Sequence, residues 1–126
     1  MSLRNPLARA RGLGSAKEGV HHWWMQRLTA AAMVPLTLWF VISIIAHLGA
    51  GRLEIVGWLS SPVSAALMIA FLVALFWHAK LGLQVVIEDY VHNEAVKVAS
   101  LTAMTFAVII VGLACVVSVL KLAFGG

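Results

Sequence analysis

Three long stretches without a charged side chain dominate this sequence. They run over Leu28–Leu48, Ile55–Ala79 and Val98–Leu120. Each reaches about 20 residues, the length of α-helix that crosses a hydrocarbon core of about 30 Å. Only 11% of the 126 residues are charged and 62% are hydrophobic, whereas about 25% are charged in soluble domains. The sequence therefore predicts an all-α membrane protein with three transmembrane helices.

The spans and the segments between them account for the whole chain as one three-helix unit. We expect a basic cytoplasmic leader at 1–27, transmembrane helices at 28–48, 62–87 and 98–120, an outer loop at 49–61, a cytoplasmic loop at 88–97 and an outer tail at 121–126. No segment outside the spans is long enough to build its own core, which excludes a self-contained soluble active site. The single cysteine, Cys115, excludes an intrachain disulfide and a CxxCH haem attachment.

Basic residues before the first span predict the orientation of the chain. Five precede it, whereas the next loop holds only Arg52; the five are Arg4, Arg9, Arg11, Lys17 and Arg27. Because Lys and Arg favour the cytoplasmic side, the N-terminus should face the cytoplasm. The net charge of +4 is thereby explained without nucleic acid as a partner. We expect a bacterial inner membrane, and a mitochondrial transit peptide stays open as the alternative.

Two spans carry packing signals. Pro35 removes the helical hydrogen bond to the Ala31 carbonyl and predicts a kink in the first helix. In the third span no ionisable residue precedes Lys121, and small residues lie on one ridge: Ala99, Ala103, Ala107 and Cys115. Such a ridge predicts a helix-packing seam rather than a site of chemistry.

His78 is the deepest ionisable residue of the second span, about 13 Å from its inner end. Ionisable residues inside a membrane are costly and are therefore functional candidates. Residues on the same ridge recur every fourth position and are mostly small: Ala66, Ala70, Ala74, Gly82 and Val86. A small-residue ridge admits a helix or a flat cofactor close to the backbone. Three interpretations remain open: a histidine hydrogen-bonded to another helix, a haem ligand, or a proton-transfer group.

His47 and Lys80 are the other ionisable residues in the predicted spans. The first helix places His47 about 28 Å from the inner face, about 15 Å from the depth of His78. Because two axial nitrogens must reach one iron, this chain cannot supply both ligands of a haem, and a partner must supply the second. We interpret His47 as an interfacial histidine and expect Lys80 to extend its ammonium group toward the inner interface.

The inner ends of the first two spans hold a polar and aromatic cluster. Its members are His21, His22, Trp23, Trp24, Gln26 and Arg27 before the first span, and Glu88, Asp89 and Tyr90 after the second. Asp89 lies about 20° from the His78 face of the helix. A phenol, a carboxylate and a guanidinium can bind and protonate a quinone. The alternative is an ordinary interfacial belt of aromatic and charged residues.

Two segments of this sequence resemble a known family. They are GVHHWWMQRLTA at 19–30 and HAKLGLQVVIEDYV at 78–91. These segments are similar to the signature regions of the D-type hydrophobic membrane anchor of succinate dehydrogenase, respiratory complex II, in its alphaproteobacterial form. Lys80 departs from the apolar or aromatic residue that relatives often have at this position.

The resemblance implies a cofactor, partners and residue roles. It implies a bundle with a second, C-type anchor subunit that holds one haem b between the two chains, and docking of an iron-sulfur subunit and a flavoprotein subunit on the cytoplasmic side. By motif, His78 matches the axial haem ligand and the ligand of its iron. Tyr90 matches the residue that binds the ubiquinone carbonyl, and Asp89 its neighbouring carboxylate. His21 and Arg27 match residues near the haem propionates and the quinone.

The expected function is therefore electron transport in the tricarboxylic acid cycle, as the membrane anchor of a heterotetrameric succinate:ubiquinone oxidoreductase with ubiquinone as substrate. Succinate oxidation would take place on a partner, since this chain alone has no succinate-oxidising site. Two alternatives stay open. One is the anchor of a quinol:fumarate reductase, and the other is a non-redox membrane scaffold or transporter subunit.

Overall fold

The computed structural model describes residues 17–125, with side chains from residue 19 onward. This part of the chain contains helices and no strand: α2 (Lys17–Ala46), α3 (Arg52–Ser60), α4 (Pro62–Tyr90) and α5 (Glu94–Ala123). Three segments are long and apolar enough to cross a membrane, namely Gly19–Ala46, Pro62–Tyr90 and Glu94–Ala123. The prediction of an all-α fold with three transmembrane helices is confirmed.

Each long helix extends beyond its uncharged stretch at one end or at both. The first begins at Lys17, inside the basic leader, the second continues to Tyr90, and the third begins at Glu94. A helix satisfies its own backbone hydrogen bonds and can therefore continue into the polar interface, where charged side chains are tolerated. The loss of charge thus marks the apolar part of a helix and not its ends. Arg4, Arg9 and Arg11 of the leader lie outside the described residues.

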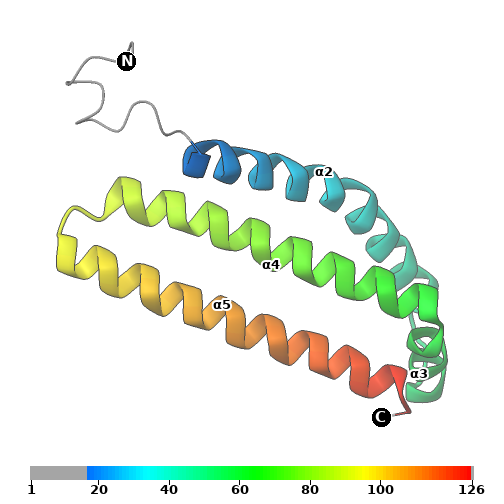
Figure 1. Cartoon of the computed structure of the whole chain (residues 1–126). Helices are drawn as coiled ribbons and strands as arrows, with labels where there is room; N and C mark the ends of the chain where they lie inside the picture. The colour runs from blue at the N-terminus through cyan, green and yellow to red at the C-terminus, as the bar shows by residue number, and fades with distance from the viewer. Residues whose placement is uncertain (1–16, 126) are drawn as a thin grey trace.

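Short connections join the helices. The segment 49–61, expected as an outer loop, contains α3, which follows a turn at Gly49 with a φ of 81°. Pro62 stands at the start of α4, where its missing N–H costs no helical hydrogen bond. Asn93 caps α5 by accepting a hydrogen bond from the Val96 backbone N–H at 3.1 Å. These connections make α2, α4 and α5 successive antiparallel neighbours (Figure 1).

The middle of the structure is α4. It contacts α2 along one side and α5 along the other, whereas α2 and α5 do not contact each other, and α3 packs on α4 and α5 (Figure 1). The three long helices therefore form a single layer rather than a closed bundle. A single layer leaves both broad faces of α4 without cover from the described part of this chain.

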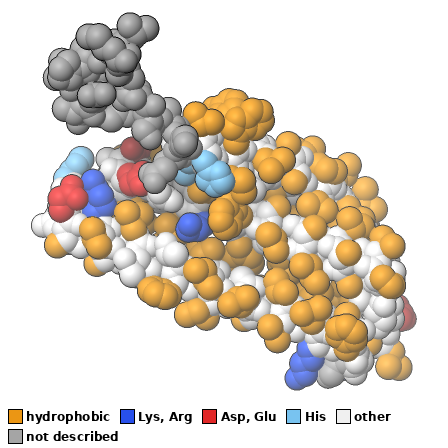
Figure 2. Space-filling view, viewed as in Figure 1, with side chains coloured by type: hydrophobic (Ala, Val, Ile, Leu, Met, Phe, Trp, Pro, Cys, Tyr) orange, Lys and Arg blue, Asp and Glu red, His pale blue; other side chains and the backbone are white. Residues whose placement is uncertain are grey.

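The apolar core lies at the α3 end of this layer. Its buried residues are Leu59, Met68, Phe71 and Val119. Phe40 of α2 stacks on Phe71 of α4 with ring centroids 4.7 Å apart. Elsewhere many large apolar side chains are exposed, and Figure 2 shows them over most of one face, on which charged and histidine side chains are few. This distribution is typical of a surface that meets lipid or other membrane subunits.

The two packing signals have different outcomes. Figure 1 shows α2 as a curved helix, and Pro35 lies inside it, which agrees with the expected kink. The small residues Ala99, Ala103 and Ala107 of α5 are exposed, so the described helices do not pack along this ridge and the seam stays a prediction. Instead, a Cβ built at Gly112 would lie 3.5 Å from the Phe76 ring of α4. A uniformly apolar helix carries little signal about which of its faces meets its neighbour.

Candidate functional site

His78 projects from α4 toward α2 and is hydrogen-bonded there. Its Nδ1 atom lies 3.2 Å from the Oγ1 atom of Thr29. Thr29 is the buried polar residue of this interface, with 7% of its surface exposed, while His78 is half-buried. The hydrogen-bonded histidine that the sequence left open is thus present, with Thr29 as its partner.

The other ring nitrogen of His78, Nε2, has no hydrogen-bond partner among residues 19–125. Histidines that bind a metal commonly use one nitrogen for the metal and the other for a hydrogen bond. A Cβ added at Gly82, one turn further along α4, would meet nothing within 4 Å, so there is open space on the turn that follows His78. The donor atom and this space fit an axial haem ligand.

His47 lies in a different environment, near α3. Its Nδ1 atom is 2.7 Å from the Ser43 carbonyl oxygen, and its ring stacks on Trp58 with centroids 4.5 Å apart. Ser43 and Thr29, the α2 partners of the two histidines, are about 21 Å apart along the helix axis. His47 and His78 therefore do not share a site, in agreement with the depths inferred from the sequence.

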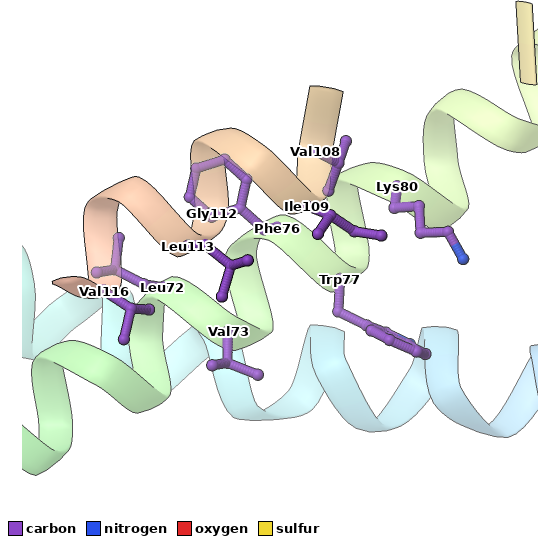
Figure 3. Close-up of a pocket in the computed structure, with 10 residues that line it drawn as sticks. All are labelled: Leu72, Val73, Phe76, Trp77, Lys80, Val108, Ile109, Gly112, Leu113 and Val116. Atoms are coloured by element: carbon purple, nitrogen blue, oxygen red, sulfur yellow. The ribbon is translucent and has the colours of Figure 1, made fainter. Parts of the chain in front are cut away.

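Lys80 packs against an aromatic ring of its own helix. Its Nζ atom lies 5.2 Å from the centroid of the Trp77 ring. Both side chains border a groove of about 280 Å³ between α4 and α5 that is otherwise lined by apolar residues, with Gly112 at its floor (Figure 3). The ring face offers Lys80 a partly exposed cation–π contact.

A second hollow, of about 560 Å³, lies between the N-terminal end of α2 and the C-terminal half of α4. It is lined by His21, His22 and Met25 of α2 and by Trp77, Lys80, Leu81 and Gln84 of α4. His21 and Lys80 therefore line the same hollow, a relationship that the sequence analysis missed. The spacing of the residues indicates part of this arrangement, because Trp77, Lys80 and Gln84 are three and four residues apart and therefore lie on one face of α4.

Arg27 does not join this hollow. Its guanidinium lies 5.5 Å from the centroid of the Trp23 ring, and the side chain is exposed. Arg27 and Thr29 are two residues apart, which corresponds to a rotation of about 200° around the helix axis. Since Thr29 faces α4, Arg27 faces away from it. The sequence analysis grouped Arg27 with the acidic end of α4. In the described part of the chain, Arg27 does not contact that end directly.

Asp89 and Tyr90 lie at the last turn of α4. Both are exposed, Tyr90 by 77%. The neighbouring Glu88 accepts a hydrogen bond from the Gln84 side-chain nitrogen at 3.1 Å. Neither Asp89 nor Tyr90 has a hydrogen bond or ion pair with a residue of 19–125. Their carboxylate and phenol are thus accessible to a ligand or to another subunit.

Gln26 is a polar residue of the inner end to which sequence reasoning gave no role of its own. Its Oε1 atom is buried and has no hydrogen-bond donor within the described residues. A buried acceptor without a donor costs about 1–3 kcal/mol. The amide belongs to the turn of α2 that also contacts His78, since the Thr29 hydroxyl reaches the Gln26 carbonyl at 3.2 Å.

Comparison with known proteins identifies the family. A family model described as succinate dehydrogenase/fumarate reductase transmembrane subunit matches residues 1–117. The chain belongs to this family. The match covers Thr29, His78, Asp89 and Tyr90, so the hydrogen-bonded histidine and the exposed end of α4 both lie inside the matched region.

Individual relatives agree with the family assignment. The succinate dehydrogenase hydrophobic membrane anchor subunit of Rickettsia bellii is 36% identical over 89 residues, 71% of each chain. The anchor subunit of Rickettsia conorii is 30% identical over 114 residues, 90% of this chain and 85% of the relative. That of Paracoccus denitrificans is 28% identical over 106 residues, 84% and 82% of the two chains. No solved structure matches.

These comparisons confirm the resemblance to the alphaproteobacterial hydrophobic anchor. As a member of the succinate dehydrogenase/fumarate reductase transmembrane family, the chain is a membrane anchor subunit. Its three apolar helices are the membrane part expected of such a subunit.

Proposed function

We propose that this chain is the D-type anchor of a succinate:ubiquinone oxidoreductase, that it shares a haem b with a C-type anchor subunit, and that it forms part of the ubiquinone-reduction site. The observation that carries the proposal is the state of His78. Its Nδ1 atom is held by Thr29 and its Nε2 atom has no partner in the described part of the chain.

Within this proposal His78 supplies one axial nitrogen to the haem iron. The second comes from the C-type partner, because His47 is engaged with Ser43 and Trp58 near the other end of α2. Gly82 places no side chain on the turn of α4 that follows His78, and a Cβ there would meet nothing within 4 Å, which favours close approach of a flat macrocycle. A bound haem would accept and release single electrons.

The proposed quinone site lies at the inner end of α4. Reduction of a quinone to a quinol consumes two electrons and two protons, so the site needs a hydrogen-bond donor to the carbonyl and a proton source. The exposed Tyr90 phenol can donate to the carbonyl, and Asp89 can exchange protons with water. His21, which lines the same hollow as Lys80, offers a ring N–H donor, and Arg27 offers a positive charge, to propionates or quinone oxygens.

The single-layer shape supports a role inside a larger complex. The uncovered apolar faces of α4 require lipid or another membrane chain, which we propose to be the C-type anchor. An iron-sulfur subunit and a flavoprotein subunit would dock at the cytoplasmic end, and succinate oxidation would take place at the flavin. We place this complex in the bacterial inner membrane. The anchor of a quinol:fumarate reductase would differ in the direction of electron flow, and a non-redox scaffold would lack the haem.

A reduced-minus-oxidised visible spectrum of the purified native complex tests the haem proposal. We expect a b-type signal in the wild type, its loss in His78→Ala, and its retention in His47→Ala, which removes the other histidine of the predicted spans. A full b-type signal in an assembled His78→Ala complex would refute ligation by His78. A wild-type complex without haem would favour the non-redox scaffold.

Electron transfer to quinone tests the role of Tyr90 and Asp89. Tyr90→Phe and Asp89→Asn should lower succinate:quinone reductase activity and leave succinate oxidation with a water-soluble electron acceptor unchanged, because that reaction takes place on the partner subunits. Loss of a general acid or base typically costs about 10²–10⁴-fold in rate, and a single neutral hydrogen bond costs less. Wild-type quinone turnover and affinity in both variants would contradict the proposed roles of Tyr90 and Asp89 in the quinone site.

A further inference from the structure

We infer that Thr29 is a positioning residue for His78: its hydroxyl holds the imidazole in the tautomer that carries the proton on Nδ1, so that Nε2 presents its lone pair to the haem iron. The inference rests on the proposed function, since it assigns a role to Thr29 only if His78 binds haem. The interaction joins α2 and α4 and cannot be predicted from the sequence of either helix alone.

The hydroxyl proton of Thr29 determines the direction of the hydrogen bond. Thr29 Oγ1 lies 2.7 Å from the Met25 carbonyl oxygen, 3.2 Å from the Gln26 carbonyl oxygen and 3.2 Å from His78 Nδ1. A hydroxyl has one proton to donate, and a carbonyl oxygen can only accept. The shortest contact takes that proton, so Thr29 donates to Met25 and offers a lone pair to His78.

His78 must therefore donate from Nδ1. A neutral imidazole carries one proton, and with that proton on Nδ1 the Nε2 atom is an acceptor or a metal ligand. When a histidine binds a metal through one ring nitrogen, the hydrogen bond of its other ring nitrogen fixes both the tautomer and the rotation of the ring. Thr29 thus selects the nitrogen that can bind iron.

Burial makes this selection strict. Thr29 is 7% exposed and lies on a helix apolar enough to cross a membrane. Water is scarce at such a position, and a substituted side chain without an acceptor would leave the Nδ1–H group unpaired. The i−4 hydrogen bond to Met25 also restrains the Thr29 rotamer. The acceptor is consequently positioned before a ligand arrives.

The hydrogen bond also affects the bound haem. Donation from Nδ1–H increases the electron density of the imidazole and makes Nε2 a more basic ligand, which favours the oxidised iron. Removal of the acceptor should weaken haem binding and raise the midpoint potential of the haem that remains. A role of Thr29 in helix packing alone would lower the yield of the complex without moving this potential.

The experiment compares three variants in the whole complex. Thr29→Val keeps the shape of the side chain and removes the acceptor, Thr29→Ser keeps the hydroxyl, and Thr37→Val removes a hydroxyl from the same helix at an exposed position without a hydrogen bond in the described residues. Haem per complex, haem affinity and midpoint potential are measured. We expect a loss of about 10–100-fold in haem affinity for Thr29→Val, with a higher midpoint potential, and values near wild type for Thr29→Ser and Thr37→Val.

Wild-type affinity and potential in Thr29→Val would overturn the inference and leave the proposed function intact. Retention of haem in an assembled His78→Ala complex would instead refute haem ligation by His78, the part of the proposed function on which this inference rests. A measurement on the wild type covers the case in which Thr29→Val fails to assemble. With histidine ring nitrogens labelled in this chain, NMR of the reduced complex should show an exchange-protected proton on Nδ1 of His78, and a proton on Nε2 would overturn the inference.

Discussion

Phe40 and Phe71 stack with their ring centroids 4.7 Å apart and their planes inclined by 15°. Phe40 is about 16 Å along α2 from Thr29, so two separate contacts set α2 on α4. The aromatic stack belongs to the apolar core near α3. The hydrogen bond of Thr29 to His78 belongs to the more open inner half. The stack thereby holds the helices in the register that the hydrogen bond requires.

Phe71→Ala should destabilise the α2–α4 contact. The aromatic pair contributes about 0.5–1.5 kcal/mol beyond the area that it buries, and the lost ring also leaves a cavity. We expect a lower melting temperature of the detergent-purified complex, together with easier loss of haem. Phe124→Ala is the control, because Phe124 is 86% exposed beyond the end of α5. Equal destabilisation by both substitutions would contradict this prediction.

Gly112 should accept alanine but not leucine. A Cβ at this position meets the Phe76 ring at 3.5 Å, which is ordinary van der Waals contact, and Gly→Ala inside a helix gains up to about 1 kcal/mol. A leucine side chain would displace Phe76 and separate α5 from α4. Thermal unfolding should show Gly112→Ala at or above wild type and Gly112→Leu below it. As control, Gly57→Leu adds the same bulk where a Cβ meets nothing within 4 Å.

Lys80→Met should not destabilise the complex. A lysine at the centre of a membrane helix costs about 2.5–3.5 kcal/mol, whereas an exposed cation–π contact such as that with Trp77 returns about 0.5–1 kcal/mol. Removal of the charge should leave the melting temperature unchanged or raise it. Lys97→Met, which removes a lysine paired with Glu94 at 3.7 Å, serves as comparison. A marked loss of stability or haem in Lys80→Met would show that the ammonium binds a ligand or partner.

The orientation of the chain is open to a direct test. Five basic residues before the first span predict a cytoplasmic N-terminus and, after three spans, an outer C-terminus. Alkaline phosphatase fused after residue 126 should therefore be active, and green fluorescent protein at the same place should be dark. Fusions in the connection 91–93 should give the reverse result. Fluorescence from the C-terminal fusion would invert the proposed topology, including the side on which Tyr90 lies.

Much of the fold was predictable because hydropathy is a local property. Any stretch of about 20 apolar residues must satisfy its backbone inside lipid, and a helix does so without help from the rest of the chain. The Gly49–Ser61 segment was not predicted as helical, since α3 is short and packs on α4 and α5. Short helices depend on tertiary contacts for their stability.

The candidate site was predictable residue by residue but not in its contacts. His78 stands out as an ionisable group in an apolar helix, and Asp89 and Tyr90 stand out at the end of that helix. Thr29 does not stand out, because threonine is common in membrane helices and its role depends on the side chain opposite. The surroundings of Arg27 and Lys80 were missed for the same reason, since the rotation of α2 turns Arg27 away from α4 and leaves His21 and Lys80 lining the same hollow.

The sequence by itself determined that this chain has three membrane helices and that His78 is its unusual residue, because both follow from the cost of placing polar groups in hydrocarbon. The tertiary structure alone decided that α4 lies between α2 and α5 and that Thr29 meets His78. Helices that are apolar all round carry no pattern that specifies their rotation or register. Side-chain packing and a single buried hydrogen bond between helices must supply that information.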